Sequence, residues 1–203
     1  MPLSLITPPE AEPLDLDAVK DQCRIGRDAS DQDALLSSYI IPAARERAES
    51  QTGRALLTQT WDLVLDVFPD EGYIEIPKPP LIRVDSLKYQ DQAGVVQTWA
   101  ASHYVVQAPA GPRCQCGRLA LAYGMTWPTT LGEIGDVVVR FTCGWETEGD
   151  VPGLIKMAML MDAATLYANP ETIVKGAGVV QLPGGVRDIY WFYRAHARQR
   201  RCA

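Results

Sequence analysis

Histidine is scarce in this sequence of 203 residues, where it occurs only as His103 and His196. Neither histidine has a cysteine, aspartate or serine at a spacing that suggests a catalytic triad. Cys114 and Cys116 form a single Cys-x-Cys pair, whereas a structural zinc site needs about four ligands. We therefore expect two loop thiols rather than a metal site, and we predict that the chain has no cofactor and is not an enzyme.

Long apolar runs are also missing. No run reaches the roughly 18 residues that a membrane-spanning helix needs, so no membrane partner is expected. The first residues have neither a basic start nor a long apolar core, so we expect no secretion signal there. Five cysteines, an odd number, favour reduced thiols in a cytoplasm over a disulfide framework.

Charge is unevenly distributed along the chain. The net charge is −6, yet the segment from Arg187 onward has five arginines against one acid, Asp188, and so carries +4 while the rest carries −10. The acidic body disfavours non-specific binding to duplex DNA, because phosphate contacts need lysine and arginine. The basic end is a candidate contact for an acidic partner, and a solvated tail is the alternative.

Helical patterns occur near both ends of the chain. The proline-rich residues 1–13 predict an extended arm, and a short helix is predicted over residues 14–24. A longer helix is predicted from an N-cap at Ser30 or Asp31 to a C-cap at Gly53. Pro42 removes one helix hydrogen bond, so a kink or a break into two shorter helices is expected there.

The middle of the chain, residues 58–144, predicts β structure. Trp61, Leu63 and Leu65 recur with a period of two, and turn signals follow every several residues. The proline-rich stretch 77–80 excludes a central strand and marks a sheet edge or a crossing. The predicted fold is therefore α+β: a small helical bundle from both chain ends, with an inserted antiparallel β-rich domain of sandwich or barrel type.

Residues 152–169 predict a helix that is apolar on most sides, followed by a flexible loop over residues 170–186. Such a helix must be buried on more than one face, and the chain offers few other helices to cover it. Another copy of the chain is then a natural partner. The candidate subunit-interface residues are Leu154, Met157 and Met161, together with Leu35 and Tyr39 of the longer helix.

The last segment, residues 187–201, predicts a helix that carries four consecutive aromatic residues, Tyr190 to Tyr193. Four successive aromatics point around most of a helix, so one protein body cannot easily cover them all. Aromatic and arginine side chains dominate protein interfaces. Two alternatives are open: the segment contacts a partner, or it packs back into its own domain.

The order of these features resembles the head–tail connector, or adaptor, proteins of long-tailed bacteriophages and gene transfer agents. The resemblance covers about residues 3–170. The residues that carry it are Leu5-Ile6-Thr7-Pro8-Pro9, Thr52-Gly53-Arg54-Ala55-Leu56, Thr60-Trp61-Asp62-Leu63, Ile76-Pro77 with Pro80-Leu81, Tyr123-Gly124 with Trp127-Pro128, Val139-Arg140-Phe141 with Gly144, Val151-Pro152, Ile155-Lys156, Ala158-Met159 and Tyr167-Ala168-Asn169.

The resemblance implies a structural role in the virion neck. Such proteins, assembled in the bacterial host cytoplasm, form a ring, usually twelve-fold, beneath the portal of the capsid. The ring extends the DNA channel and meets a stopper or tail-terminator protein, while genomic DNA passes through without sequence-specific binding. The implied organisation is a helical connector core from residues 1–54 and 150–203, with an inserted β-rich domain at 55–149.

The resemblance also implies that the C-terminal segment docks on the portal protein. The portal-docking candidates are Arg187, Ile189, Tyr190, Trp191, Phe192, Tyr193, Arg194 and Arg198. A different function is a carbohydrate or host-surface binding module of β-sandwich type. Its stacking platform would comprise Trp99, Tyr104, Trp127 and Trp145, for which the alternative is a place in the sandwich core.

Overall fold

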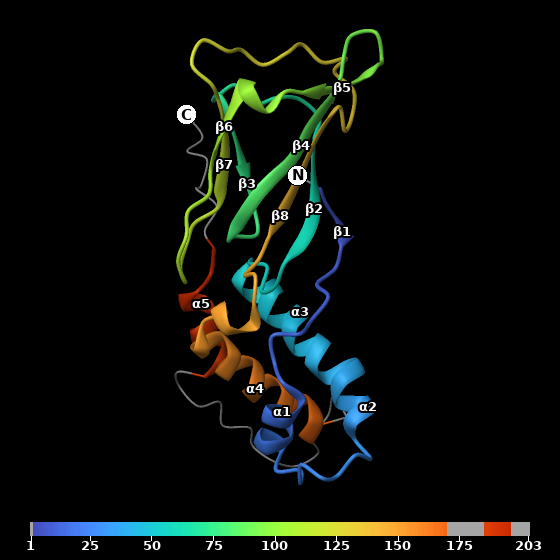
Figure 1. Cartoon of the computed structure of the whole chain (residues 1–203), viewed down its shortest axis with the longest axis vertical. Helices are drawn as coiled ribbons and strands as arrows, with labels where there is room; N and C mark the ends of the chain where they lie inside the picture. The colour runs from blue at the N-terminus through green and yellow to red at the C-terminus, as the bar shows by residue number, and fades with distance from the viewer. Residues whose placement is uncertain (1, 170–184, 196–203) are drawn as a thin grey trace, which may run out of the picture.

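The computed structural model describes residues 2–169 and 185–195. The chain is elongated, with a helical unit at one end and a β unit at the other (Figure 1). The helices are α1 (Leu16–Cys23), α2 (Asp33–Leu35), α3 (Ile41–Thr52), α4 (Gly153–Ala168) and α5 (Val186–Phe192), with a π-helical segment (Leu36–Ile40) between α2 and α3. The strands are β1 (Leu3–Thr7), β2 (Gln59–Leu65), β3 (Tyr73–Ile76), β4 (Leu81–Gln90), β5 (Val96–Trp99), β6 (Tyr104–Gln107), β7 (Gly117–Leu121) and β8 (Val137–Cys143).

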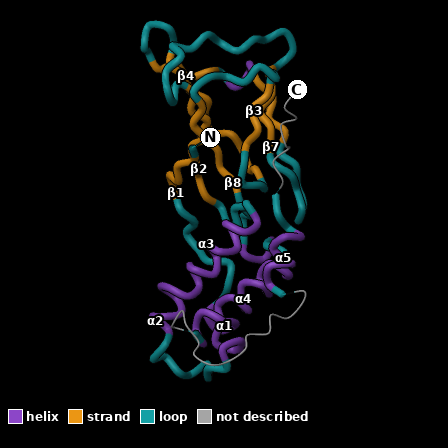
Figure 2. The backbone as a smooth tube through the Cα atoms, turned by 180° about the vertical axis from the view of Figure 1, so that it is seen from behind, coloured by secondary structure: helices purple, strands orange, loops and turns teal. Residues whose placement is uncertain are grey.

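The β unit consists of two antiparallel sheets that share one core. One sheet has the strand order β1-β2-β8-β4-β5, and the other has the order β3-β7-β6. Leu63 of β2, Ile74 of β3 and Phe141 of β8 are completely or almost completely buried in this shared core. The helices lie at both ends of the sequence and the sheets between them, so the predicted α+β class is confirmed (Figure 2).

The N-terminal arm is extended, as expected, but it is also a strand. β1 pairs antiparallel with β2, placing Leu3 opposite Leu63 and Leu5 opposite Trp61, at the edge of the larger sheet. A strand at the edge of a sheet forms hydrogen bonds on one side only. It therefore tolerates nearby prolines, which have no backbone N–H to donate. The beginning of the chain therefore belongs to the β unit, although the residues that follow it are helical.

The long helical run changes its geometry just before Pro42. The π-helical segment leads directly into α3, and Ile40 and Ile41 keep right-handed helical dihedrals, so the run continues from Asp33 to Thr52. The alternative of a break into two shorter helices is therefore wrong and that of a kink stays a prediction, whereas the predicted C-cap at Gly53, which has a φ of 67°, is confirmed. The predicted N-cap was wrong: helix α2 begins at Asp33, and the carboxylate of Asp33 instead pairs with the buried ammonium group of Lys20 at 2.5 Å.

The helical unit has its own core, formed by all four longer helices. Leu36, Ala44, Ala48, Ile155 and Met159 are fully buried in it. Helix α4 contacts α1, α3 and α5, so it is the central helix of the unit.

The proline-rich residues 77–80 connect the two sheets. They cross from β3 in the smaller sheet to β4 in the larger one, as their prolines predicted.

The two units approach each other closely at the end of β8. Gly144 has a φ of +108°, and a Cβ atom there would lie 2.1 Å from the carbonyl oxygen of Leu57. Only glycine fits a position with both a positive φ and a backbone at that distance. The turn at Gly144 thus brings the strand into contact with the segment that leaves the helical unit.

Candidate functional site

Helix α4 is buried along one side and exposed along the other. Ile155, Ala158 and Met159 lie in the helical core. On the opposite side, Leu154 is 53% exposed, Met157 46% and Met161 40%, at spacings of three and four residues that align them in one stripe. Among the described residues, the helix is covered on one side only, which leaves an apolar stripe on its surface.

Leu35 and Tyr39 are a second exposed apolar pair. They lie one turn apart at the junction of α2 and the π-helical segment, with exposures of 42% and 70%. All five residues predicted for a subunit interface are therefore exposed. Their place between two copies of the chain stays a prediction.

The aromatic block at the C-terminus divides into two pairs. Tyr190 and Tyr193 are buried in the helical core, whereas Trp191 is 64% and Phe192 46% exposed. The hydroxyl of Tyr190 donates a hydrogen bond of 2.8 Å to Asp162 Oδ2. Packing into the chain's own domain therefore describes Tyr190 and Tyr193, and a partner contact of Trp191 and Phe192 stays a prediction.

The carboxylate of Asp162 is the polar centre between α3, α4 and α5. It accepts the bond from Tyr190 and lies 3.3 Å from Arg47 Nη1. Burial is the largest influence on Asp162 and raises its pKa above the ordinary value of 3.8. Burial and the neighbouring carboxylate raise the pKa of Tyr190 as well, so its hydroxyl stays protonated and available as a donor.

The other docking candidates differ in exposure. Arg187 and Arg194 are exposed, and Ile189 is partly buried against the helical core. Arg198 lies outside the described residues. The exposed part of the predicted docking segment therefore consists of two aromatic rings and two guanidinium groups.

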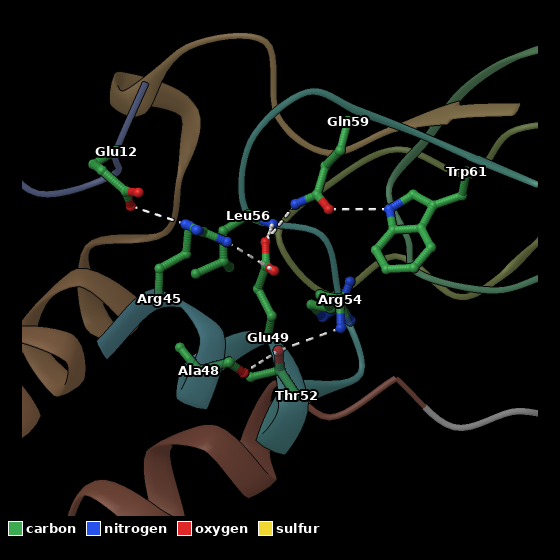
Figure 3. Close-up of polar contacts among 9 residues, drawn as sticks. All are labelled: Glu12, Arg45, Ala48, Glu49, Thr52, Arg54, Leu56, Gln59 and Trp61. Carbon is green, nitrogen blue, oxygen red and sulfur yellow. Dashed lines mark hydrogen bonds and ion pairs between the residues drawn. The ribbon is translucent and has the colours of Figure 1, made fainter. Parts of the chain in front are cut away.

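A buried polar network joins the helical unit to the β unit (Figure 3). Glu49 of α3 accepts hydrogen bonds from the backbone N–H of Leu56 at 2.9 Å and from Gln59 Nε2 at 2.5 Å. Arg45 lies 2.9 Å from Glu12 and 3.4 Å from Glu49. The network fixes the start of β2 against α3 and against the N-terminal arm.

Arg54 is the buried cation at this junction, with a 1% exposed side chain. Its Nε donates to the carbonyl oxygen of Tyr193 at 2.5 Å, and its Nη1 lies 3.5 Å from Cys114 Sγ. The backbone N–H of Ala195 also donates to the Thr52 carbonyl at 2.7 Å. Arg54 therefore ties the end of α5 to a loop of the β unit. No local pattern predicts these contacts, because the partners of Arg54 lie 60 and 139 residues away in the sequence.

The four aromatic residues proposed as a stacking platform are not together. Trp99, Tyr104 and Trp127 pack against the β core, where the Trp127 ring stacks on Phe68 with centroids 4.7 Å apart. Trp145 packs against the helical core instead. These side chains hold the fold, and they do not form one binding face.

The described residues contain no group of three histidine, cysteine, aspartate or glutamate side chains arranged to hold a metal ion. Cys114 and Cys116 are free thiols in the loop before β7, as predicted, but both are buried, and burial raises the pKa of Cys116 to about 11. A groove of about 380 Å³ borders the junction, lined by Pro80, Leu81, Trp145 and the loop 108–112. Its ionisable lining residues are Glu146 and Asp150, and the carboxylate of Asp150 accepts a hydrogen bond from the hydroxyl of Thr147.

Across the part of the chain that the structure describes, no helix has the length and apolar character to cross a bilayer.

Similar structures exist for almost the whole chain. A chain in the virion of a native gene transfer agent particle matches with a TM-score of 0.77 at 24% identity. Chains in the neck of an empty gene transfer agent particle, computed with C6 symmetry, and of a native one, computed with C12 symmetry, match with TM-scores of 0.76 and 0.70 at 24% and 23% identity. Each match covers 97% of this chain and 97% of the other. At these identities the likeness establishes the fold.

A comparison of sequences gives a partial match. No curated protein sequence matches the chain. The family described as "Phage gp6-like head-tail connector protein" matches residues 13–104, which are less than half of the chain and run from just before α1 to the first residue of β6. Over residues 13–104, the chain is similar to the phage gp6-like head-tail connector protein family.

Proposed function

We propose that the chain is a structural head–tail connector that forms a ring of twelve copies in the neck of a phage-like particle. The ring lies beneath the portal, extends the DNA channel and meets a stopper or tail-terminator protein on its other side. The similarity of residues 13–104 to the head-tail connector family and the fold shared with neck chains of gene transfer agent particles support this role. Genomic DNA passes through the lumen, and the acidic body of the chain keeps DNA from adhering.

The apolar stripe on α4 is the observation that carries the ring. Leu154, Met157 and Met161 leave 40–53% of their surface in water along one helix face. A continuous exposed apolar surface on a folded chain marks a contact with another protein. A neighbour that covers the stripe through a different surface makes a heterologous contact, and such contacts close into a ring when the rotation permits.

The C-terminal segment is the proposed contact with the portal. Tyr190 and Tyr193 anchor α5 in the helical core, while Trp191 and Phe192 point their exposed rings away from it. Arg187 and Arg194 flank these rings on the surface. Anchored aromatics beside arginines are the residues that contribute most to protein–protein affinity.

The test of ring formation is a double substitution, Met157→Asp with Met161→Asp. Two carboxylates in the stripe must lose their hydration if a neighbour covers it, so assembly should be abolished while the fold remains. Native mass spectrometry of the protein, alone and mixed with portal rings, measures the copy number, and thermal unfolding checks the fold. The matched control is Val105→Asp, because Val105 is 60% exposed on β6, in the β unit. Rings formed equally well by the double variant would exclude the α4 stripe as the subunit interface.

A further inference from the structure

We infer that the β unit contributes Arg113 to the docking surface of α5, and that this composite surface fits an apolar groove bordered by carboxylates on a partner protein. The inference rests on the proposed function, in which that partner is the portal. The docking patch is defined here as Trp191, Phe192, Arg187 and Arg194 of the C-terminal segment together with Arg113.

Arg113 contacts the exposed aromatic pair directly. Its guanidinium carbon lies 4.0 Å from the centre of the Phe192 ring, within the range of a cation–π contact. The Phe192 ring also meets the ring of Tyr193 edge-on, with centroids 5.2 Å apart and an interplanar angle of 80°. Because Tyr193 is buried, Phe192 is held between a fixed ring and a cation while 46% of it remains exposed.

The loop that carries Arg113 is itself fixed to the C-terminal segment. The next residue, Cys114, is buried and receives the Nη1 contact from Arg54, whose Nε binds the Tyr193 carbonyl. Arg113 is therefore positioned by the same buried guanidinium that positions the end of α5. A side chain held before binding loses less conformational freedom when a partner arrives.

The arginines of the docking patch form no ion pair with another described residue. Elsewhere on the surface, Arg27, Arg83 and Arg140 form ion pairs with Asp21, Asp85 and Asp62. Among the described residues, no carboxylate lies within 4.0 Å of Arg113, Arg187 or Arg194. The docking patch thus combines two exposed rings with three guanidinium groups that have no ion pair among the described residues. Carboxylates of a partner protein can bind these groups.

This combination defines the chemistry of the partner. Trp191 and Phe192 gain by entering an apolar groove that removes them from water. The planar guanidinium groups bind carboxylates through two parallel hydrogen bonds, which fixes the orientation of the partner. DNA would satisfy the charges but would leave the rings without apolar pockets, and the chain as a whole carries a net charge of −6. The patch therefore favours an acidic, apolar protein surface.

The test measures the affinity of the full chain for immobilised portal rings. The expected result is about tenfold weaker binding for Arg113→Ala and a larger loss for Arg113→Glu, since a reversed charge faces the partner carboxylates. The wild-type affinity should also fall with added salt more steeply than that of Arg113→Ala. The matched control is Arg118→Ala, which removes another arginine that lies over an aromatic ring, 5.2 Å from the Tyr73 centroid. Thermal unfolding verifies that all variants keep the fold.

The outcomes separate this inference from the function on which it rests. If the wild-type chain does not bind portal rings, both the portal-docking role and the composite surface are refuted. If it binds and Arg113→Glu binds equally well, the composite surface is refuted while portal docking stands. A parallel measurement uses a short DNA duplex: duplex binding that Arg113→Glu abolishes would reassign the patch to nucleic acid and overturn the inference.

Discussion

Helix α4 and strand β8 are the central elements of their two units, and they differ in how completely the chain covers them. Strand β8 lies between β2 and β4, and its inward residues Val137, Val139 and Phe141 are fully buried. On its outer side, Arg140 forms a double hydrogen bond with Asp62 at 2.8 and 2.7 Å. Helix α4 is buried as deeply on one side but presents leucine and methionine to water on the other.

The difference indicates which unit depends on other molecules. Around β8, the larger sheet needs no partner to cover it. Its inward apolar residues are buried by the same chain, and Arg140 and Asp62 pair with each other on the outer side. In the part of the chain that the structure describes, α4 is covered only on the side where α1, α3 and α5 pack. We therefore expect substitutions in β8 to act on folding and substitutions on the open side of α4 to act on assembly.

The largest expected effect is on the free energy of unfolding of the single chain. Phe141→Ala removes a fully buried ring from the β core and should cost about 3–5 kcal/mol. Met157→Ala, on the open side of α4, should cost less than about 1 kcal/mol in the same denaturant titration, because Met157 is 46% exposed. Comparable losses in the two variants would show that α4 is covered as fully as β8.

A second, smaller effect is expected at the junction between the units. Arg54→Ala leaves the Tyr193 carbonyl without its donor and opens space in a buried site, at a cost of about 2–3 kcal/mol. Limited proteolysis should also cleave faster near α5, because that helix loses its tie to the β unit. The control is Arg83→Ala. The Arg83 side chain is 64% exposed and pairs with Asp85, so its loss should change the free energy of unfolding by less than about 1 kcal/mol. Equal effects of the two substitutions would contradict a special role for Arg54.

The smallest effect concerns pH and the carboxyl of Asp162. Burial raises the pKa of this group in the folded chain above 3.8, so the folded state holds the proton at a pH where the unfolded state has lost it. The contribution of Asp162 to stability should therefore fall as pH rises through the window just above that value. Asp162→Asn cannot titrate, so the free energy of unfolding of wild type minus that of the variant should decrease between about pH 3.5 and 7. A difference that rises with pH would indicate that the pairing with Arg47 outweighs burial.

Much of the fold follows from local patterns in the sequence. The period of two along Trp61, Leu63 and Leu65 predicted β2, and Gly53 predicted where the helical run ends. Strand β1 was not predicted as a strand, because its evidence is a pairing between Leu3 and Leu63, far apart in sequence. The N-cap was predicted at Ser30 or Asp31, whereas α2 begins at Asp33 and Gln32 precedes it, with no side-chain cap hydrogen bond.

The site was predictable only in its chemical composition. Hydrophobic residues all around a helix indicate that most of its surface is buried by other segments. They do not indicate which side is buried within its own chain and which side stays exposed. The same holds for the aromatic block, where the deciding contacts are the bond from Tyr190 to Asp162 and the buried position of Tyr193. Arg54 had no local pattern, since its partners come from a strand-connecting loop and from the C-terminal segment.

The path of the backbone has a mechanical consequence. The chain starts in the sheet at β1, passes to α1, returns from α3 to β2, and passes back from β8 to α4. Within residues 2–169, the covalent chain thus crosses between the two units three times, through residues 8–15, 53–58 and 144–152. Tension along the long axis is divided among three parallel tethers, and a bending motion between the halves must deform all three together.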